Sequence, residues 1–295
     1  MSPHLQGFSA HEWASGQGVL WEESSGRMAL SRGRIVRFFP LLSTRPWALH
    51  AELTGPPQSQ EALRDRLGSE APMIAVVDLG PEAHAELRAP DGWTEVLRHS
   101  RTMPLPAAPQ DVALPKTREK QERRFLKEGG TVMVDVGHDP ATWGAVERLH
   151  HVSRERKGLH MPTSQLSSLL RRIAKAPWTF ASVALDEEGN AMASGGFVVL
   201  ADGTCVYAFG GQQRGPMSGR ASVAMICAAM RKAQSMGCHT FDFGGSQDLG
   251  VDRFYKEFGG QAVPRRRWVK APLLFQWCFP TLWRTWTRTS RALNH

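Results

Sequence analysis

The sequence contains only four cysteines, Cys205, Cys227, Cys238 and Cys278, and no two of them form a CxxC pair. This wide spacing argues against a disulfide framework and against a cysteine metal site, so we expect buried, reduced thiols. No apolar run approaches the length that a membrane span requires. The first residues, MSPHLQGFSAHEW, also lack the basic start and apolar core of a signal peptide. Together these absences predict a cytoplasmic protein.

Acidic residues are outnumbered in this chain of 295 residues, with 28 Asp and Glu against 36 Lys and Arg and a formal net charge of +8. A basic protein favours anionic partners, such as a phosphorylated carrier, a nucleic acid or an acidic membrane surface. The charge does not choose among them, and a basic surface that only maintains solubility explains it equally well. A hydrophobic content of 41% predicts a globular protein with a substantial core.

The chain is long enough for two domains, and a stretch rich in proline and alanine divides it. This stretch, LPAAPQDVALP at 105–115, has neither helical nor strand periodicity, and we expect it to be a linker. The residues before it form an α/β half without an evident site. Its predicted elements are a strand at 33–42, a helix at 60–68, a strand at 71–80, a short helix starting at Pro81 and a strand at 93–105.

The residues after the linker predict a definite order: strand, two helices, three-stranded meander, glycine-rich loop, helix, strand, helix and strand. Leucine spacing at i, i+3, i+4 and i+7 places the second helix at 164–176. The charged segment KTREKQERRFLKEGG at 116–130 comes before this order and is predicted to be a solvated helix with i, i+4 ion pairs. A basic rim that faces a phosphate or an acidic ligand is the alternative interpretation.

Three segments carry a resemblance to a known fold. They are LHHVSRERKGLHMP at 149–162, RGPMSGRASVAMICAAMRKAQSMG at 214–237, and FDFGG followed by DRFYKEFGG within 241–260. Their residue patterns and the order of the predicted elements resemble those of the GNAT acyltransferases, and most closely those of the FemAB-like branch. The resemblance covers about residues 114–270, whereas the first hundred residues are only loosely similar to that branch.

The resemblance implies an α/β (α+β) fold of tandem GNAT-like domains, the first degenerate, each with a mixed sheet flanked by helices. The expected divisions are a degenerate domain at 1–113, an acyltransferase domain at 114–270 and a Trp/Arg-rich tail at 271–295. It also implies direct transfer of an acyl group to an amine from an activated carrier, either acyl-CoA or acyl carrier protein. No metal or tightly bound cofactor is expected, and no Cys, Ser or His triad pattern offers a covalent relay.

Two other functions stay open at this point. The peptidoglycan-bridge branch uses aminoacyl-tRNA as donor, and the basic charge suits it, although no heptad run indicates the coiled-coil arm that such proteins usually carry. A catalytically inactive module that binds a membrane surface is the second alternative.

A carrier with phosphate groups needs backbone N–H groups at a helix N-terminus, where they are unpaired and the helix dipole favours anions. The segment before the helix predicted at 221–237 resembles the GNAT pattern Gln/Arg-x-x-Gly-x-Gly/Ala, but Met217 and Pro216 break the two frames in which it can be read. A flexible connecting loop is the alternative. The candidate carrier-binding residues are Gln212, Arg214, Gly215, Gly219, Arg220 and Ala221.

Three residues are candidates for catalysis: Tyr255, Lys256 and Asp242. Tyr255 is similar to the GNAT tyrosine that protonates the leaving thiolate, and its alternative is a core aromatic. Lys256 matches the lysine of the family's FK motif, which implies contact with the donor, and its alternative is a solvated surface lysine. Asp242 ends a predicted strand and could act as a general base, although hydrogen bonding to nearby backbone N–H groups is the favoured interpretation.

The acceptor side is predicted around the first helix and the loop after it, from the position of that loop in GNAT folds. The candidates are His150, Arg154, Lys157 and His160. Basic residues near a helix C-terminus can instead complement its dipole.

The tail alternates tryptophan with arginine, as Trp277, Trp283 and Trp286 with Arg284, Arg288 and Arg291. Such a segment could lie at an anionic membrane surface, at the inner face of the cell membrane. Packing on the first domain, with tryptophan as core, is the favoured alternative.

Overall fold

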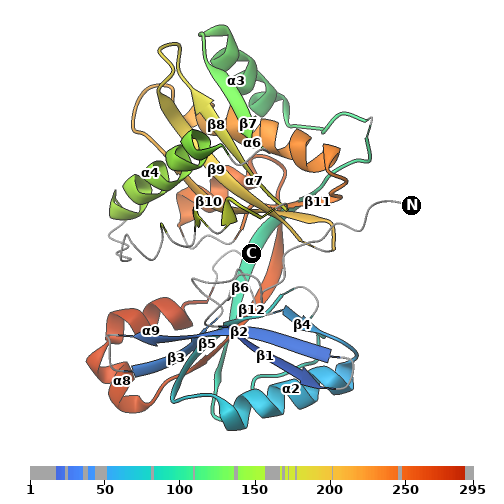
Figure 1. The fold of residues 1–295 in the computed structure, drawn as a ribbon, viewed down its shortest axis with the longest axis vertical. Coiled ribbons are helices and arrows are strands. Elements are labelled where there is room, and N and C mark those ends of the chain that lie inside the picture. Colours follow the sequence, from blue (N-terminus) through green and yellow to red (C-terminus); the bar gives the residue numbers. More distant parts are fainter. Residues whose placement is uncertain are drawn as a thin grey trace. The chain divides into compact units, whose positions relative to one another are not determined.

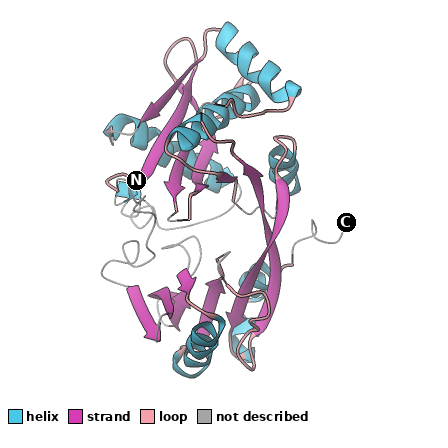
Figure 2. Cartoon of the chain, turned by 90° about the vertical axis from the view of Figure 1, so that its right-hand side faces the viewer, coloured by secondary structure: helices cyan, strands magenta, loops and turns pink. Residues whose placement is uncertain are grey.

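The computed structural model describes residues 18–23, 26–35, 39–43, 52–80, 83–108, 110–135, 139–156, 167, 170–171, 173–176, 178–200, 202–244 and 248–289. The chain forms two compact units, and each combines strands with flanking helices (Figures 1 and 2). The first unit consists of residues 9–100 and 262–295, and the second unit contains residues 101–261. These boundaries differ from the expected ones, because residues 101–113 belong to the second unit and the tail belongs to the first.

A mixed sheet forms the centre of the first unit. The strand order is β1 (Gly18–Glu23), β2 (Gly26–Ile35), β3 (Phe39–Ser43), β5 (Ile74–Asp78), β12 (Gln261–Lys270) and β6 (Thr94–Pro104), and β4 (Glu52–Thr54) pairs with β2. The β3 and β5 strands are parallel, whereas β1–β2, β2–β3 and β5–β12 are antiparallel. The strand expected at 33–42 is therefore two strands, since β2 ends at Ile35 and β3 begins at Phe39.

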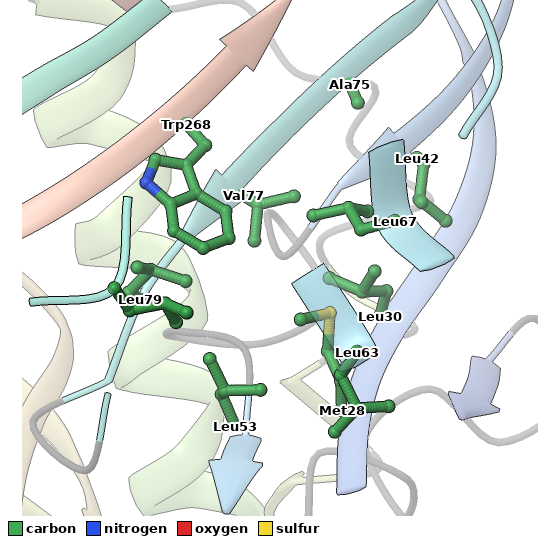
Figure 3. Packing of buried hydrophobic residues seen from close by; sticks show 11 residues of the cluster. Met28, Leu30, Leu42, Leu53, Leu63, Leu67, Ala75, Val77, Leu79 and Trp268 are labelled. Atoms are coloured by element: carbon green, nitrogen blue, oxygen red, sulfur yellow. The ribbon is translucent and has the colours of Figure 1, made fainter. Parts of the chain in front are cut away.

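One hydrophobic cluster holds helix α2 (Pro57–Glu70) against this sheet. Leu63 and Leu67, one turn apart on α2, are fully buried with Val77 and Trp268 in the same cluster (Figure 3). The indole N–H of Trp268 donates to Glu95 Oε2 at 2.9 Å, which satisfies the one polar atom of this buried ring.

The short helix expected from Pro81 is wrong for the described residues 83–93, which form turns and loop; Pro81 itself lies outside them. Arg266 gives the physical reason. Its guanidinium donates to the backbone carbonyls of Ala83, His84 and Leu87, and this long-range partner replaces the carbonyl contacts of a helix.

The second unit has the strand order β6, β11 (Thr240–Asp242), β10 (Thr204–Gln212), β9 (Ala191–Val199), β8 (Thr179–Leu185) and β7 (Thr131–Asp135). Neighbouring strands from β7 to β10 are antiparallel, which confirms the predicted meander, and β10 and β11 are parallel. Four helices accompany this sheet in the described part: α3 (Lys116–Lys127), α4 (Pro140–Arg156), α6 (Ser218–Ser235) and α7 (Leu249–Lys256). Of the helix expected at 164–176, the structure describes residues 167, 170–171 and 173–176, and residues 167, 170, 171 and 173 among them are helical.

Two of these helices cover opposite faces of the meander. The Ser182 hydroxyl on β8 donates to Met225 O of α6, and the Ser194 hydroxyl on β9 donates to Ala145 O of α4. Ser194 lies opposite Val183, the residue next to Ser182, and neighbouring residues of a strand point to opposite faces. The sheet of the second unit is therefore enclosed between α4 and α6 (Figure 1).

Helix α3 is not solvated all round, as its sequence suggested. Arg118, Glu122 and Phe125 form a buried stripe at i, i+4 and i+7. Glu122 accepts two hydrogen bonds from Arg231 of α6, at 2.6 and 2.8 Å. The predicted i, i+4 ion pairing does occur, between Arg124 and Glu128 on the exposed side. The buried charges of α3, Arg118 and Glu122, therefore serve contacts with other helices.

Glycine allows α4 to approach the backbone of β10. A Cβ at Gly211 would lie 2.0 Å from Leu149 O of α4, so no side chain fits there. Gly215, four residues later, has ordinary surroundings, because the nearest atoms to a Cβ lie at 3.7 Å.

We expect Gly211→Ala to lower the free energy of unfolding by about 1–3 kcal/mol, since the helix must move away from the strand. Gly215→Ala is the matched control and should change it by less than about 0.5 kcal/mol. Urea denaturation followed by circular dichroism measures both, and equal stability of the two variants would contradict the close approach.

Candidate active site

The strands β10 and β11 separate after three residue pairs. Thr204–Val206 pairs in parallel with Thr240–Asp242, and the ladder between the two strands ends there. β10 continues to Gln212 along β9, with a register shift between Tyr207 and Phe209. A parallel pair that opens in this way leaves a gap beside the far end of β10.

A pocket of about 530 Å³ occupies the region beside this opening. We call it the splay pocket, and its lining comes from β10, from the N-terminal half of α6, from α7 and from the end of α4. Its lining residues are Ser153, Arg156, Tyr207, Gly210, Gly211, Gln212, Arg214, Gly219, Ser222, Ile226, Asp248, Gly250, Val251, Phe254 and Tyr255. All of them belong to the second unit.

Both tyrosines of the chain line the splay pocket. The Tyr255 ring stacks on Phe243, with centroids 5.1 Å apart, and meets the Tyr207 ring edge-on at 6.3 Å. Burial raises the pKa of Tyr255 well above its usual value, and the nearby Tyr207, Asp242 and Asp248 raise it further. Burial likewise raises the pKa of Tyr207. Both phenols are therefore neutral hydroxyls, able to donate a proton, throughout the physiological range.

Buried ion pairing fixes the helix that carries Tyr255. Arg101 of β6 donates to both carboxylate oxygens of Asp252 in α7, at 2.9 and 2.8 Å. The same guanidinium donates to Gly260 O at 3.3 Å, in the turn that follows α7. The hydrogen bonds to Asp252 raise the pKa of Arg101, so this cation is permanent. A bidentate pair of this kind sets position and orientation together.

Two further contacts hold α7 at its ends. Asp248 caps the N-terminus by accepting from the Gly250 and Val251 N–H groups. At the C-terminal end, Arg118 of α3 donates to Phe254 O at 3.1 Å and to Glu257 Oε2 at 2.6 Å. The Arg118 guanidinium also lies over the Phe254 ring, 4.7 Å from its centroid.

Arg101→Met removes one partner of the buried pair and leaves the Asp252 carboxylate uncompensated. We expect the free energy of unfolding to fall by about 3–5 kcal/mol. Arg66→Met, which breaks the exposed pair with Glu70 on α2, is the control and should cost less than about 1 kcal/mol. Urea denaturation measures both variants, and a loss at Arg101 no larger than that at Arg66 contradicts the anchoring role.

The candidate carrier-binding residues are only partly brought together. Gln212, Arg214 and Gly219 line the splay pocket, and Arg214 is exposed at its edge. Arg220 points elsewhere, because its guanidinium donates to Glu128 Oε2 at 2.6 Å. Ala221 is fully buried, and its N–H is already bonded to Met217 O. Gly215 is exposed and does not belong to the lining.

The other two catalytic candidates lie outside the pocket lining. Lys256 is exposed on the last turn of α7. Asp242 is buried, and its Oδ1 accepts from the Gly244 N–H at 2.7 Å, the backbone contact that the sequence favoured. A catalytic role for either residue stays a prediction.

On the predicted acceptor side, His150 holds α4 to β10. Its Nδ1 lies 3.1 Å from Gly210 O and 3.3 Å from Gly210 N, and its ring meets Phe209 edge-on. Arg154 is half-buried, and burial lowers the pKa of its guanidinium. Lys157 and His160 lie outside the described residues. Among the described side chains, no group of three or more His, Cys, Asp and Glu is placed to hold a metal ion.

Sequence reasoning missed three residues of this site: Tyr207, Arg101 and Arg118. Tyr207 carried a readable signal, since it is one of only two tyrosines and lies in a predicted strand that ends in a glycine pair. Arg101 and Arg118 carried none, because their partners are 151 and 139 residues away along the chain.

A larger hollow of about 720 Å³ lies beside the loop that contains Gln213 and Arg214. Arg214 lines both hollows, whereas neither tyrosine reaches the larger one. The arrangement of proton donor, helix N-terminus and open strand edge exists in the splay pocket alone of these two.

Solved structures with the same arrangement of elements exist. The crystal structure of FemX matches with a TM-score of 0.65 and 12% identity, covering 92% of this chain and 95% of that one. The chain has a GNAT-like fold, similar to that of FemX. Because the match covers 92% of the chain, it includes both units, as the tandem GNAT-like architecture predicts.

Two other solved structures extend this likeness. The C-terminal domain of a putative lysylphosphatidylglycerol synthetase from Agrobacterium fabrum matches with a TM-score of 0.62 and 12% identity, covering 98% of this chain and 95% of that domain. A GCN5-related N-acetyltransferase from Kribbella flavida matches with a TM-score of 0.50 and 15% identity, covering 90% of this chain and 96% of that one. No protein-family model matches this chain, and no curated protein does. A likeness at this level of identity establishes fold, and activity must be argued from the site.

Proposed function

We propose that this protein transfers an acyl group from an activated carrier to an amine, directly and within the splay pocket. One observation carries the proposal: a neutral phenol, the N-terminal half of α6 and the end of β10 beyond its ladder with β11 line a single pocket of about 530 Å³. An acyl transfer needs a proton donor for the leaving group and N–H donors for the carrier or the oxyanion.

The chemistry assigns Tyr255 as general acid. The amine nitrogen attacks the carbonyl carbon of the carrier's thioester or ester, a C–N bond forms, and the C–S or C–O bond breaks. The leaving sulfur or oxygen takes the proton of the Tyr255 hydroxyl, and the proton released by the amine restores the phenol. The pKa of this desolvated phenol lies above physiological pH, so Tyr255 starts each cycle protonated.

Two guanidinium groups in the lining, Arg156 and Arg214, suit a carrier that bears phosphate groups. Acyl-CoA and acyl carrier protein are the donors we propose first. Aminoacyl-tRNA remains the alternative, supported by the diversion of Arg220 to Glu128 and by the broken Gln-x-x-Gly-x-Gly/Ala pattern. Both features weaken the usual pyrophosphate cradle of acyl-CoA enzymes.

Native mass spectrometry of the purified full chain tests the donor class. A copurified thioester or pantetheine group supports acyl-CoA or acyl carrier protein, and a copurified tRNA supports the aminoacyl alternative. Thiol release from a panel of acyl-CoA compounds with amine acceptors then measures turnover. Absence of any carrier together with absence of thiol release and of aminoacyl transfer contradicts an acyltransferase and favours the inactive module.

Tyr255→Phe removes only the hydroxyl, so the ring packing on Phe243 survives. We expect kcat to fall by about 10²–10⁴-fold, with KM and thermal stability nearly unchanged. Arg253→Ala, on the exposed side of the same helix, is the control and should leave kcat within about twofold. Loss of activity by Arg253→Ala equal to that by Tyr255→Phe contradicts the assignment.

The pH dependence follows from the raised pKa of Tyr255. The group acts protonated, and its folded-state pKa lies above the ordinary value of 10, so kcat should not decline on its account until the pH is above 10. The same shift stabilises the folded state below pH 10, and this contribution disappears as the pH rises toward the folded-state pKa. A kcat profile with an alkaline limb below pH 9 that is absent in Tyr255→Phe contradicts this environment.

A further inference from the structure

The tail of the first unit has an inner face that belongs to the core. Phe275 of α8 (Leu273–Cys278) is buried and stacks on Trp286 of α9 (Pro280–Thr287), with ring centroids 5.5 Å apart. Trp283 and Trp286 pack against the cluster of Val76, Val96 and Val269. Two of the three tryptophans of the tail are thus partly buried against the core, and the third requires another explanation.

The outer face of α8 exposes large apolar side chains. Leu273 and Leu274 are each 72% exposed, and Trp277 is 81% exposed. Leu273 and Trp277 are one helical turn apart, so the three side chains crowd onto a helix of six residues. Single exposed apolar residues are common, but a leucine pair and a tryptophan gathered in one turn mark an interaction surface.

The chain around this face carries charge of one sign. From Phe258 to the C-terminus there are seven Lys and Arg and not one Asp or Glu. Arg266 and Arg267 are used internally, for backbone carbonyls and for Asp78. Arg284 and Arg288, one turn apart at the end of the tail, are exposed. The outer face of the tail is therefore apolar on α8 and cationic on α9.

We propose that the outer faces of α8 and α9, which we call the tail face, dock on an anionic lipid bilayer. Leu273, Leu274 and Trp277 would enter the interfacial layer, and Arg284 and Arg288 would contact lipid phosphates. A protein partner matches the size less well, because a standard interface buries about 800 Å² per partner and α8 has six residues. A nucleic acid would use the arginines and leave the leucine pair in water. Among the described helices none is long and apolar enough to cross a bilayer, so the contact is peripheral.

Vesicle cosedimentation of the full chain tests the apolar part. The protein should bind vesicles of phosphatidylcholine with phosphatidylglycerol, and bind phosphatidylcholine alone at least about tenfold more weakly. The triple variant Leu273→Ser, Leu274→Ser and Trp277→Ser should lower the partition coefficient by about tenfold or more. The control is Met73→Ser with Leu97→Ser, which removes two exposed apolar side chains that lie outside the tail segment, and it should leave the partition coefficient within about twofold.

A second pair of variants tests the contribution of the tail arginines to vesicle binding. Arg284→Gln with Arg288→Gln should weaken binding at low ionic strength by about fivefold or more and reduce its salt dependence. Arg123→Gln with Lys127→Gln removes two charges from the exposed side of α3 and should leave binding within about twofold. Thermal midpoints check that all variants fold; since the substituted side chains are exposed, they should stay near that of the parent.

Three results overturn the proposal. They are absence of binding to anionic vesicles at low salt, equal binding by the tail variants and their controls, and capture of an acidic carrier protein or tRNA by the tail face while vesicles stay unbound. The first two results leave the proposed acyl transfer untouched, because that chemistry uses residues of the second unit alone. The third result would instead assign the tail face to the carrier of that reaction.

Discussion

The placement of one half-buried phenol is the constraint around which the second unit is organised. Tyr255 lies between Phe243 and Tyr207, and burial there holds its proton in place. A side chain with this property is useful only if its helix is fixed, since a shift of about 1 Å in a catalytic group costs most of its effect. The buried pair of Arg101 and Asp252 supplies that fixation from the sheet side.

A chain of ion pairs extends the fixation through α3 to the other helices. Arg118 holds the C-terminal end of α7, Glu122 binds Arg231 of α6, and Glu128 binds Arg220 at the start of α6. The α3 helix therefore braces α6 and α7, two of the three helices that border the splay pocket. Part of the basic charge of this chain is consumed in this bracing, which is why net charge alone is a poor guide to the ligand.

Sequence patterns predicted those features that depend on neighbours along the chain. The periods of apolar residues located the meander, α2, α4 and α6, and the FDFGG and FYKEFGG segments located the tyrosine of the pocket. Features that depend on distant polar partners could not be predicted. By sequence Arg220 suited a phosphate, but in the structure it binds Glu128, which lies 92 residues earlier in the chain. A helix was predicted over residues 83–93, but Arg266, more than 170 residues later in the chain, donates hydrogen bonds to backbone carbonyls of this segment. Composition alone does not reveal which polar group binds which.

The protonation state of the buried phenol is the claim on which the account depends most directly, and the chain offers an unusually simple measurement. It contains only two tyrosines, so labelling with ¹³C at the tyrosine Cζ gives two resonances, which Tyr207→Phe assigns. We predict that the Tyr255 resonance at pH 10, where an ordinary phenol is about half ionised, is still that of a predominantly neutral phenol, and that it changes when an acyl carrier binds. A Tyr255 resonance that titrates with a pKa of about 10 or lower would place this phenol in water and contradict the account.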